Sequence, residues 1–282
     1  VYALANQEEM GDILQSLYLM GDTLFAVINN SQKIIALNAR TFAKIGVINT
    51  GGFPQSFCPT GDGFALVTDL FGGPVKVVNL STFAVVSNFS CPGSTGDMLP
   101  IGDGIYMTNS SSEYLYKVSK ASKTIVDSVL VGKGANGLAL DKNGKVWISL
   151  GIVYDENFMP IENGKIKRLN VSSKAIEFNQ TLVAGGARKL KINASNDVLY
   201  YLNNGVQKME ITSTSLPTIP FYSAAGASFN ALGIDPVNQY ILVGDAKNYT
   251  SEGTVTVLRQ DGSVQSSYTA GVAPSDFAFI KQ

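Results

Sequence analysis

Short apolar segments that end in a small or amide-bearing residue recur along the chain. Each follows a turn signal rich in glycine, aspartate or asparagine, and their last residues are spaced by 40, 40, 42, 52 and 42 residues. After each comes a second segment in which apolar and polar residues alternate, as a half-buried strand requires. The first set comprises LFAVIN (24–29), FALVTD (64–69), GIYMTN (104–109), VWISLG (146–151), VLYYLN (198–203) and YILVGD (240–245).

The repeating unit is predicted to be a sheet of four strands. A further strand follows each second segment and an innermost strand precedes each unit, so one unit takes about 40 residues. A single sheet of this size cannot bury both of its faces, whereas radial stacking against its neighbours does so. The pattern therefore predicts one all-β domain over 1–282, a β-propeller of four-stranded antiparallel blades. A flat solenoid is the alternative, and the meandering blades argue against it.

The blade count is uneven. We find seven innermost strands, the last over 274–280, but only six pairs of middle strands. Residues 1–6 supply at most one outermost strand. We therefore expect a seven-bladed β-propeller with one blade incomplete, and roughly 30–40 residues absent upstream. The alternative is a complete six-bladed ring with a spare strand.

Composition narrows the class of protein. With 45% hydrophobic and 15% charged residues the chain is not of the disordered class. Its net charge of −1 comes without a basic stripe, which argues against nucleic-acid binding, and no apolar run reaches the ~18 residues of a membrane span. Cys58 falls on an innermost strand and Cys91 at the end of an outer one, so two buried thiols are favoured over a disulfide.

Several segments carry a resemblance to a known family. The Gly-x-x-Pro register at Gly51 and at Gly271, and strands that end in Thr-Asp or Thr-Asn, resemble YVTN/YncE-like propeller repeats. The stretches at 11–34, 65–82, 138–151 and 232–246 are similar to the surface lipoprotein propellers of gut Bacteroidetes. Some of these, the BtuG-like members, capture cobalamin for a TonB-dependent outer-membrane transporter. The resemblance implies seven blades, extra N-terminal strands and a lipid-anchored cysteine upstream of this chain.

Candidate chemistry is limited because the chain has no histidine. Ser-His-Asp triads, Cys-His dyads and His-ligated metal sites are thereby excluded. A metal-dependent lyase or lactonase would need carboxylates around a central ion, and Asp69, Asp97, Asp245 and Asp276 are the candidates. The favoured interpretation is that aspartates at strand ends cap the following turns. We predict a protein without cofactor or catalytic residues.

Two loop insertions are the more informative features. They span 152–164 and 246–253, and both follow the same strand of their blades, which places them on one face. Loops on a rigid scaffold are where binding residues concentrate. Tyr154, Phe158 and Tyr249 on these loops, with Phe71 on the same rim, are candidate ligand contacts. Packing of these side chains against the blade edge is the alternative.

Residues at the start of the innermost strands are predicted to reach the same face near the axis. Amides and charges ringed by aromatic side chains suit a polar, amide-bearing ligand. A corrinoid, a glycan or a peptide would fit, and a solvated channel mouth without ligand is the alternative. These residues are Gln15, Gln55, Asp97, Asn136, Arg188, Asn230 and Asp276.

The sequence thus favours a surface-exposed propeller that binds a ligand. From the resemblance, we expect a corrinoid as the ligand, a TonB-dependent transporter as the partner, and attachment to the outer membrane through a lipid anchor outside this chain. A protein- or glycan-binding scaffold without a small-molecule site is the second hypothesis, and the metal-dependent lyase or lactonase is the third.

Overall fold

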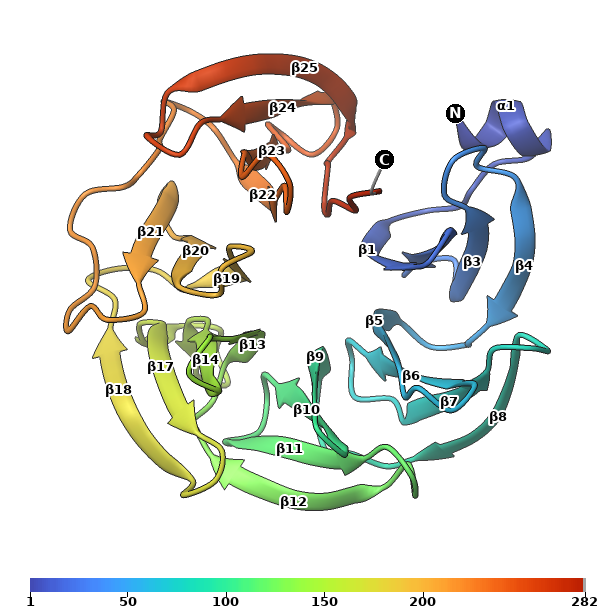
Figure 1. Cartoon of the computed structure of the whole chain (residues 1–282), viewed down its shortest axis with the longest axis horizontal. Helices are drawn as coiled ribbons and strands as arrows, with labels where there is room; N and C mark the ends of the chain where they lie inside the picture. The colour runs from blue at the N-terminus through green and yellow to red at the C-terminus, as the bar shows by residue number, and fades with distance from the viewer. Residues whose placement is uncertain (281–282) are drawn as a thin grey trace. The chain divides into compact units, whose positions relative to one another are not determined.

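The computed structural model describes residues 1–280. These residues divide into two compact units, Val1–Ser128 together with the C-terminal residues from Ala278, and Val129–Phe277. Antiparallel sheets make up nearly all of both units and follow one another along the chain (Figure 1). We call each sheet of three or four strands a blade, and number the blades in chain order.

The first three blades, which make up most of the first unit, are meanders of four antiparallel strands. Blade one contains β1 (Leu14–Met20), β2 (Thr23–Ile28), β3 (Lys33–Asn38) and β4 (Lys44–Asn49). Blade two contains β5 (Pro54–Pro59), β6 (Phe64–Asp69), β7 (Val75–Asn79) and β8 (Ala84–Phe89). Blade three contains β9 (Thr95–Ile101), β10 (Gly104–Asn109), β11 (Tyr114–Ser119) and β12 (Ile125–Leu130).

The second unit holds blades four to six. Blade four contains β13 (Ala135–Leu140), β14 (Lys145–Leu150), β17 (Lys165–Asn170) and β18 (Ala175–Thr181), with the hairpin β15 (Val153–Tyr154) and β16 (Pro160–Glu162) inserted after β14. Blade five has three strands, β19 (Arg188–Ile192), β20 (Val198–Leu202) and β21 (Val206–Glu210). Blade six contains β22 (Phe229–Ile234), β23 (Ile241–Asp245), β24 (Glu252–Leu258) and β25 (Val264–Val272).

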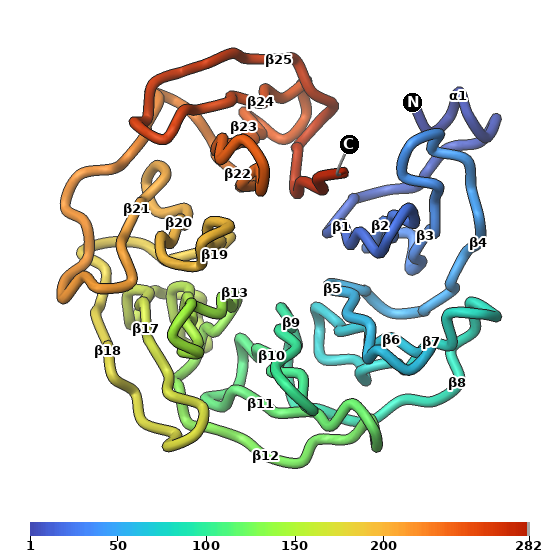
Figure 2. Tube along the Cα trace, viewed as in Figure 1, coloured from blue at the N-terminus to red at the C-terminus, as the bar shows by residue number. Residues whose placement is uncertain are grey.

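Burial falls from the middle of each blade to its last strand. Every residue of β10 is buried, and so are five of the six residues of β2, whereas β8 and β25 are largely exposed. A strand buried on both faces needs a layer on each side of its sheet. Within each unit, the first strands of successive blades lie side by side (Figure 2).

The prediction of seven blades was wrong for the described residues, which form six. Residues 274–280 make no strand, and two of their carbonyl groups accept side-chain donors: that of Pro274 from Asn230 and that of Ser275 from Lys189. At the N-terminus, Tyr2–Asn6 forms the short helix α1 rather than an outermost strand. Its leucine and alanines favour helix over strand.

Blade five also lacks the fourth strand that the repeat predicts. The chain after β21 returns to it only at one isolated bridge, between Val206 and Tyr222. Pro217 and Pro220 lie in the intervening segment and have no backbone N–H to donate to a ladder. The repeat of four antiparallel strands is confirmed in the other five blades.

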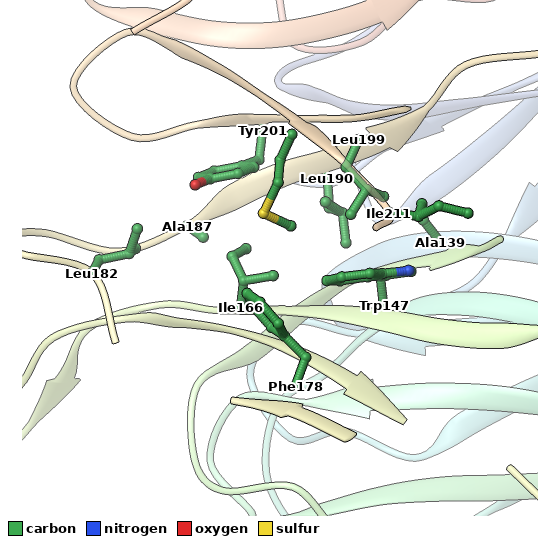
Figure 3. Packing of buried hydrophobic residues seen from close by; sticks show 11 residues of the cluster. Ala139, Trp147, Ile166, Phe178, Leu182, Ala187, Leu190, Leu199, Tyr201 and Ile211 are labelled. Carbon is green, nitrogen blue, oxygen red and sulfur yellow. The ribbon is translucent and has the colours of Figure 1, made fainter. Parts of the chain in front are cut away.

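The largest buried side chain, Trp147 on β14, packs in the cluster that joins blades four and five (Figure 3). Ile166 and Phe178 from blade four and Leu199 and Tyr201 from blade five surround it. The indole N–H of Trp147 donates to the buried carboxylate of Asp141 at 2.9 Å, so its one polar atom is satisfied. Blades one and two of the first unit are likewise joined by apolar contacts, among them the stacked rings of Phe25 and Phe57, whose centroids lie 4.4 Å apart.

Both cysteines are free and buried in one cluster of the first unit. Burial, and to a smaller extent the charge of Asp97, raises the pKa of Cys58 to about 12. Burial also raises the pKa of Cys91. Both groups are therefore neutral thiols that pack as small apolar side chains. In addition, no helix among residues 1–280 is long and apolar enough to cross a membrane.

Truncating the core between blades four and five should destabilise the second unit strongly. We expect Leu199→Ala to lower the free energy of unfolding by about 2–5 kcal/mol, because it removes apolar contacts and leaves a cavity beside Trp147. Urea unfolding followed by the fluorescence of Trp147 measures the effect. The matched control is Leu130→Ala, whose side chain is 60% exposed. Equal midpoints for the two variants would contradict the assignment of the core.

The state of the cysteines is checked with a thiol-reactive dye. We expect Ellman's reagent to label no thiol in the native protein and two per chain in denaturant, because burial and the raised pKa of Cys58 suppress the thiolate. A disulfide would instead leave the denatured chain unlabelled. Labelling of the native protein would show that the cluster is accessible.

Candidate functional site

The insertion in blade four is an ordered hairpin. Strands β15 and β16 pair in antiparallel register, and Asp155 organises the turn between them. Its carboxylate accepts the backbone N–H groups of Asn157 and Met159, both at 2.9 Å. Phe158, at the tip, has a positive φ of 59°, which the turn holds in place. The hairpin therefore presents its side chains from a defined backbone.

The apolar side chains of this hairpin face solvent. Tyr154 is 52% exposed, Phe158 85%, Met159 60% and Ile161 65%. The alternative was that Tyr154 and Phe158 fold back and pack on the blade. Most of the Phe158 side chain is instead exposed to solvent. Four large exposed apolar side chains are therefore gathered on one loop. We call these four residues the apolar hairpin.

The other two loop candidates occupy the same connection of their own blades, between second and third strands. In the second unit Tyr249 is 49% exposed and has a φ of 64°, and the side chain of Asn248 caps its loop by accepting two backbone N–H groups. In the first unit Phe71 is 70% exposed, but its ring packs edge-on against Phe53 at 4.8 Å. Phe71 therefore combines exposure with packing.

In the second unit the residues predicted at the start of innermost strands connect neighbouring blades. The amide of Asn136 donates to the carbonyl of Ala187 at 2.8 Å, and the guanidinium of Arg188 donates to that of Phe229 at 2.6 Å. The amide of Asn230 donates to the carbonyl of Pro274 at 3.2 Å and so holds the segment after β25 rather than a further blade. We call these three bonds the blade links. Each link therefore engages a side-chain N–H group of a residue that the sequence predicted to contact a ligand.

The corresponding residues of the first unit lie on β1, β5 and β9. Gln15 and Gln55 are half-buried, and the carbonyl of Gln55 accepts the hydroxyl of Ser16 at 2.8 Å. Asp97 is also half-buried, and its carboxylate accepts its neighbour's backbone N–H at 2.9 Å. Here too a side chain from one blade bonds the first strand of the next.

Carboxylates at strand ends cap turns, as the favoured interpretation predicts. Asp69 accepts backbone N–H groups of Phe53, Phe71 and Gly73, and Asp245 accepts those of Ser228 and Lys247.

Asp276, near the C-terminus, is held differently. Its carboxylate lies 3.5 Å from the ammonium of Lys191. Across residues 1–280 there is no group of three or more Asp, Glu, Cys or His side chains placed to hold a metal ion.

Sequence reasoning missed a pocket of about 460 Å³ in the second unit. Segments 185–188, 202–205 and 223–229 line it, and of the predicted residues only Arg188 takes part. Its wall reaches the base of the apolar hairpin, because the backbone N–H of Gly164 donates to the carbonyl of Gly185 at 2.8 Å. The composition of SAAGAS (223–228) is the signal that could have pointed to it.

Comparison with known proteins identifies a family and a fold. A family model described as a domain of unknown function, DUF5074, matches residues 1–271. No curated protein matches the chain.

Solved structures resemble the chain at low sequence identity. Hydrazine synthase of Kuenenia stuttgartiensis aligns over 96% of this chain and 91% of that one, with a TM-score of 0.73 and 13% identity. A quinonprotein alcohol dehydrogenase-like protein from Bacteroides thetaiotaomicron aligns over 96% of this chain and 70% of that one, with a TM-score of 0.72 and 13% identity. The Cps50 (Swd1) β-propeller domain of Myceliophteria thermophila aligns over 96% of this chain and 90% of that one, with a TM-score of 0.73 and 10% identity. These likenesses show the fold, an all-β propeller with four-stranded antiparallel blades.

Removing a blade link should cost stability. We expect Asn136→Ala to lower the free energy of unfolding by about 1–3 kcal/mol, because the carbonyl of Ala187 loses its donor and the buried hydroxyl of Ser149 its acceptor. Chemical denaturation followed by circular dichroism measures the change. Asn157→Ala, an exposed asparagine in the hairpin turn, is the matched control. If both variants unfold alike, the link carries no energy.

Proposed function

The chain belongs to the DUF5074 family, and we propose that it is a ligand-binding propeller that captures a corrinoid without chemically altering it. The apolar hairpin is the observation that carries the proposal. It holds exposed aromatic and aliphatic side chains on a backbone that Asp155 keeps ordered. A propeller provides a binding scaffold in general, and the choice of ligand comes from the resemblance of the chain to BtuG-like propellers.

A corrinoid matches such a surface chemically. It is a flat macrocycle with peripheral amides, and aromatic side chains such as Tyr154 and Phe158 supply apolar area against a flat face. Tyr154 also has a hydroxyl that can bond an amide at the edge of the ring. Tyr249 offers the same combination on the equivalent loop of blade six.

The same resemblance supports a place and a partner for the protein. We propose that it acts at the outer-membrane surface, held there by a lipid anchor outside this chain. We further propose that it hands its ligand to a TonB-dependent transporter. The side chains of Tyr154 and Phe158 on the loop 152–164 are exposed, so a ligand bound to them would stay accessible to a second protein and could be passed to it directly.

A protein- or glycan-binding scaffold is the second candidate. Its supporting observation is that Phe158 and Ile161 are more exposed than a small-molecule site needs, at 85% and 65%. Aromatic residues such as Phe158 are enriched in the core of protein–protein interfaces. The two candidates differ in whether the isolated protein binds a small molecule.

Titration with cyanocobalamin by calorimetry tests the corrinoid proposal. We expect one-to-one binding, and a loss of at least tenfold in affinity for the Tyr154→Ala, Phe158→Ala double variant, because two aromatic contacts together carry more than about 1.4 kcal/mol. Tyr268→Ala, an exposed tyrosine on the outer strand β25, should leave the affinity unchanged.

Two results would contradict the proposal. An absence of heat at all concentrations would remove the corrinoid and favour the scaffold. An unchanged affinity of the hairpin double variant would show that cyanocobalamin binds away from the apolar hairpin.

A further inference from the structure

The pocket between the loops of blades five and six has the size of a small-molecule site. Its volume of about 460 Å³ falls within the ~300–1,000 Å³ that such sites span. Three loops enclose it, one before β19, one between β20 and β21, and one before β22. Its lining is mostly polar, with Phe229 and Leu202 as the larger apolar members.

Glycines allow the loops around this pocket to pack closely. Gly185, Gly186 and Gly205 form part of its wall. Gly205 has a φ of 125°, and a Cβ there would lie 2.8 Å from the carbonyl oxygen of Tyr222. A Cβ on Gly186 would lie 2.7 Å from the backbone nitrogen of Ile152. The backbones are packed so closely that side chains cannot be added without moving the loops.

Arg188 is the only charged side chain among the described residues that line the pocket. Its bond to the carbonyl of Phe229 fixes the guanidinium, and that bond uses one of five N–H groups. No other hydrogen bond or ion pair engages the guanidinium of Arg188 within residues 1–280. The pocket therefore contains an oriented positive charge with unused donors. The carboxylate of Asp245 accepts the backbone N–H of the lining residue Ser228 at 2.8 Å but does not itself line the pocket.

Neutral polar groups complete the lining. The hydroxyls of Ser223 and Ser228 and the side-chain amide of Asn204 make no hydrogen bond within the described part of the chain. The amide of Asn203, by contrast, already donates to the carbonyls of Ala184 and Gly186. Three groups that can each donate and accept are thus available beside one fixed cation.

We propose that this pocket binds a small hydroxylated molecule that carries a single carboxylate, of the uronic acid class, with the carboxylate on Arg188. A guanidinium matches a planar carboxylate with two parallel N–H···O bonds. A single cation balances a monoanion, whereas a phosphate monoester would bring up to two negative charges against one positive charge. The serine hydroxyls and the amide of Asn204 bond the hydroxyl groups. This site is independent of the corrinoid proposal.

Three probes of matched size test the ligand class by calorimetry, in a buffer free of carboxylate and phosphate. They are glucuronate, glucose and glucose 6-phosphate. We expect glucuronate to bind at least tenfold more tightly than either of the others. Equal affinity for glucuronate and glucose, or no measurable binding of glucuronate, would overturn the proposal. Preference for glucose 6-phosphate would overturn the assignment to a carboxylate.

Variants of Arg188 test the anchor. Arg188→Gln should weaken glucuronate binding at least tenfold while the affinity for glucose stays the same. The affinity of Arg188→Lys for glucuronate should lie between those of the original protein and Arg188→Gln, because lysine keeps the charge but lacks the planar guanidinium. Because the blade link of Arg188 contributes to folding, thermal unfolding is measured alongside. Ser228→Ala keeps that link and should weaken glucuronate binding without lowering the midpoint of thermal unfolding. Unchanged glucuronate affinity in both Arg188→Gln and Ser228→Ala would overturn the site.

Discussion

Each first strand lies at an edge of its sheet, and the polar backbone groups on its free side need partners. A sheet edge inside a protein cannot leave carbonyl groups unsatisfied. In the second unit the blade links meet this requirement with side chains, Asn136 to Ala187, Arg188 to Phe229 and Asn230 to Pro274. The stacking of neighbouring blades follows, because the links of Asn136 and Arg188 bring the first strand of one blade against that of the next, while the link of Asn230 holds the segment after β25.

This constraint separates the scaffold from the candidate binding surfaces. Link residues are committed to the fold, whereas the apolar hairpin and the loop around Tyr249 extend from connections that the blades do not need for pairing. Arg188 is the residue that belongs to both, since it links blades five and six through one N–H and keeps the rest for the pocket. A binding site built partly from the scaffold is held rigidly, which lowers the entropic cost of binding.

Much of the fold could be predicted from the sequence because turns and alternating strands leave a periodic pattern. The segments 24–29 and 64–69 match β2 and β6 within one residue. The predicted number of blades was wrong because residues 274–280 have the apolar pattern of a strand, yet have no strand to pair with. The presence of a pairing partner cannot be read from the local sequence.

The candidate site was less predictable. Tyr154 and Phe158 could be placed on an insertion from spacing alone, but whether an amide such as Asn136 faces a ligand or a neighbouring carbonyl depends on contacts between blades. The pocket was invisible because its walls are backbone and small side chains from three separate loops.

The three-stranded blade has a consequence for behaviour at high concentration. An outer strand such as β21 would normally offer a free edge to strands of other molecules, the first step of aggregation. Here Tyr222 of the returning chain exchanges backbone hydrogen bonds with Val206, the first residue of β21. Pro217 and Pro220, which precede Tyr222 in that chain, have no N–H to donate to a neighbouring strand. In place of the missing strand, a proline-containing segment therefore closes the edge of β21 at its first residue, and that segment cannot itself extend the sheet as a regular strand.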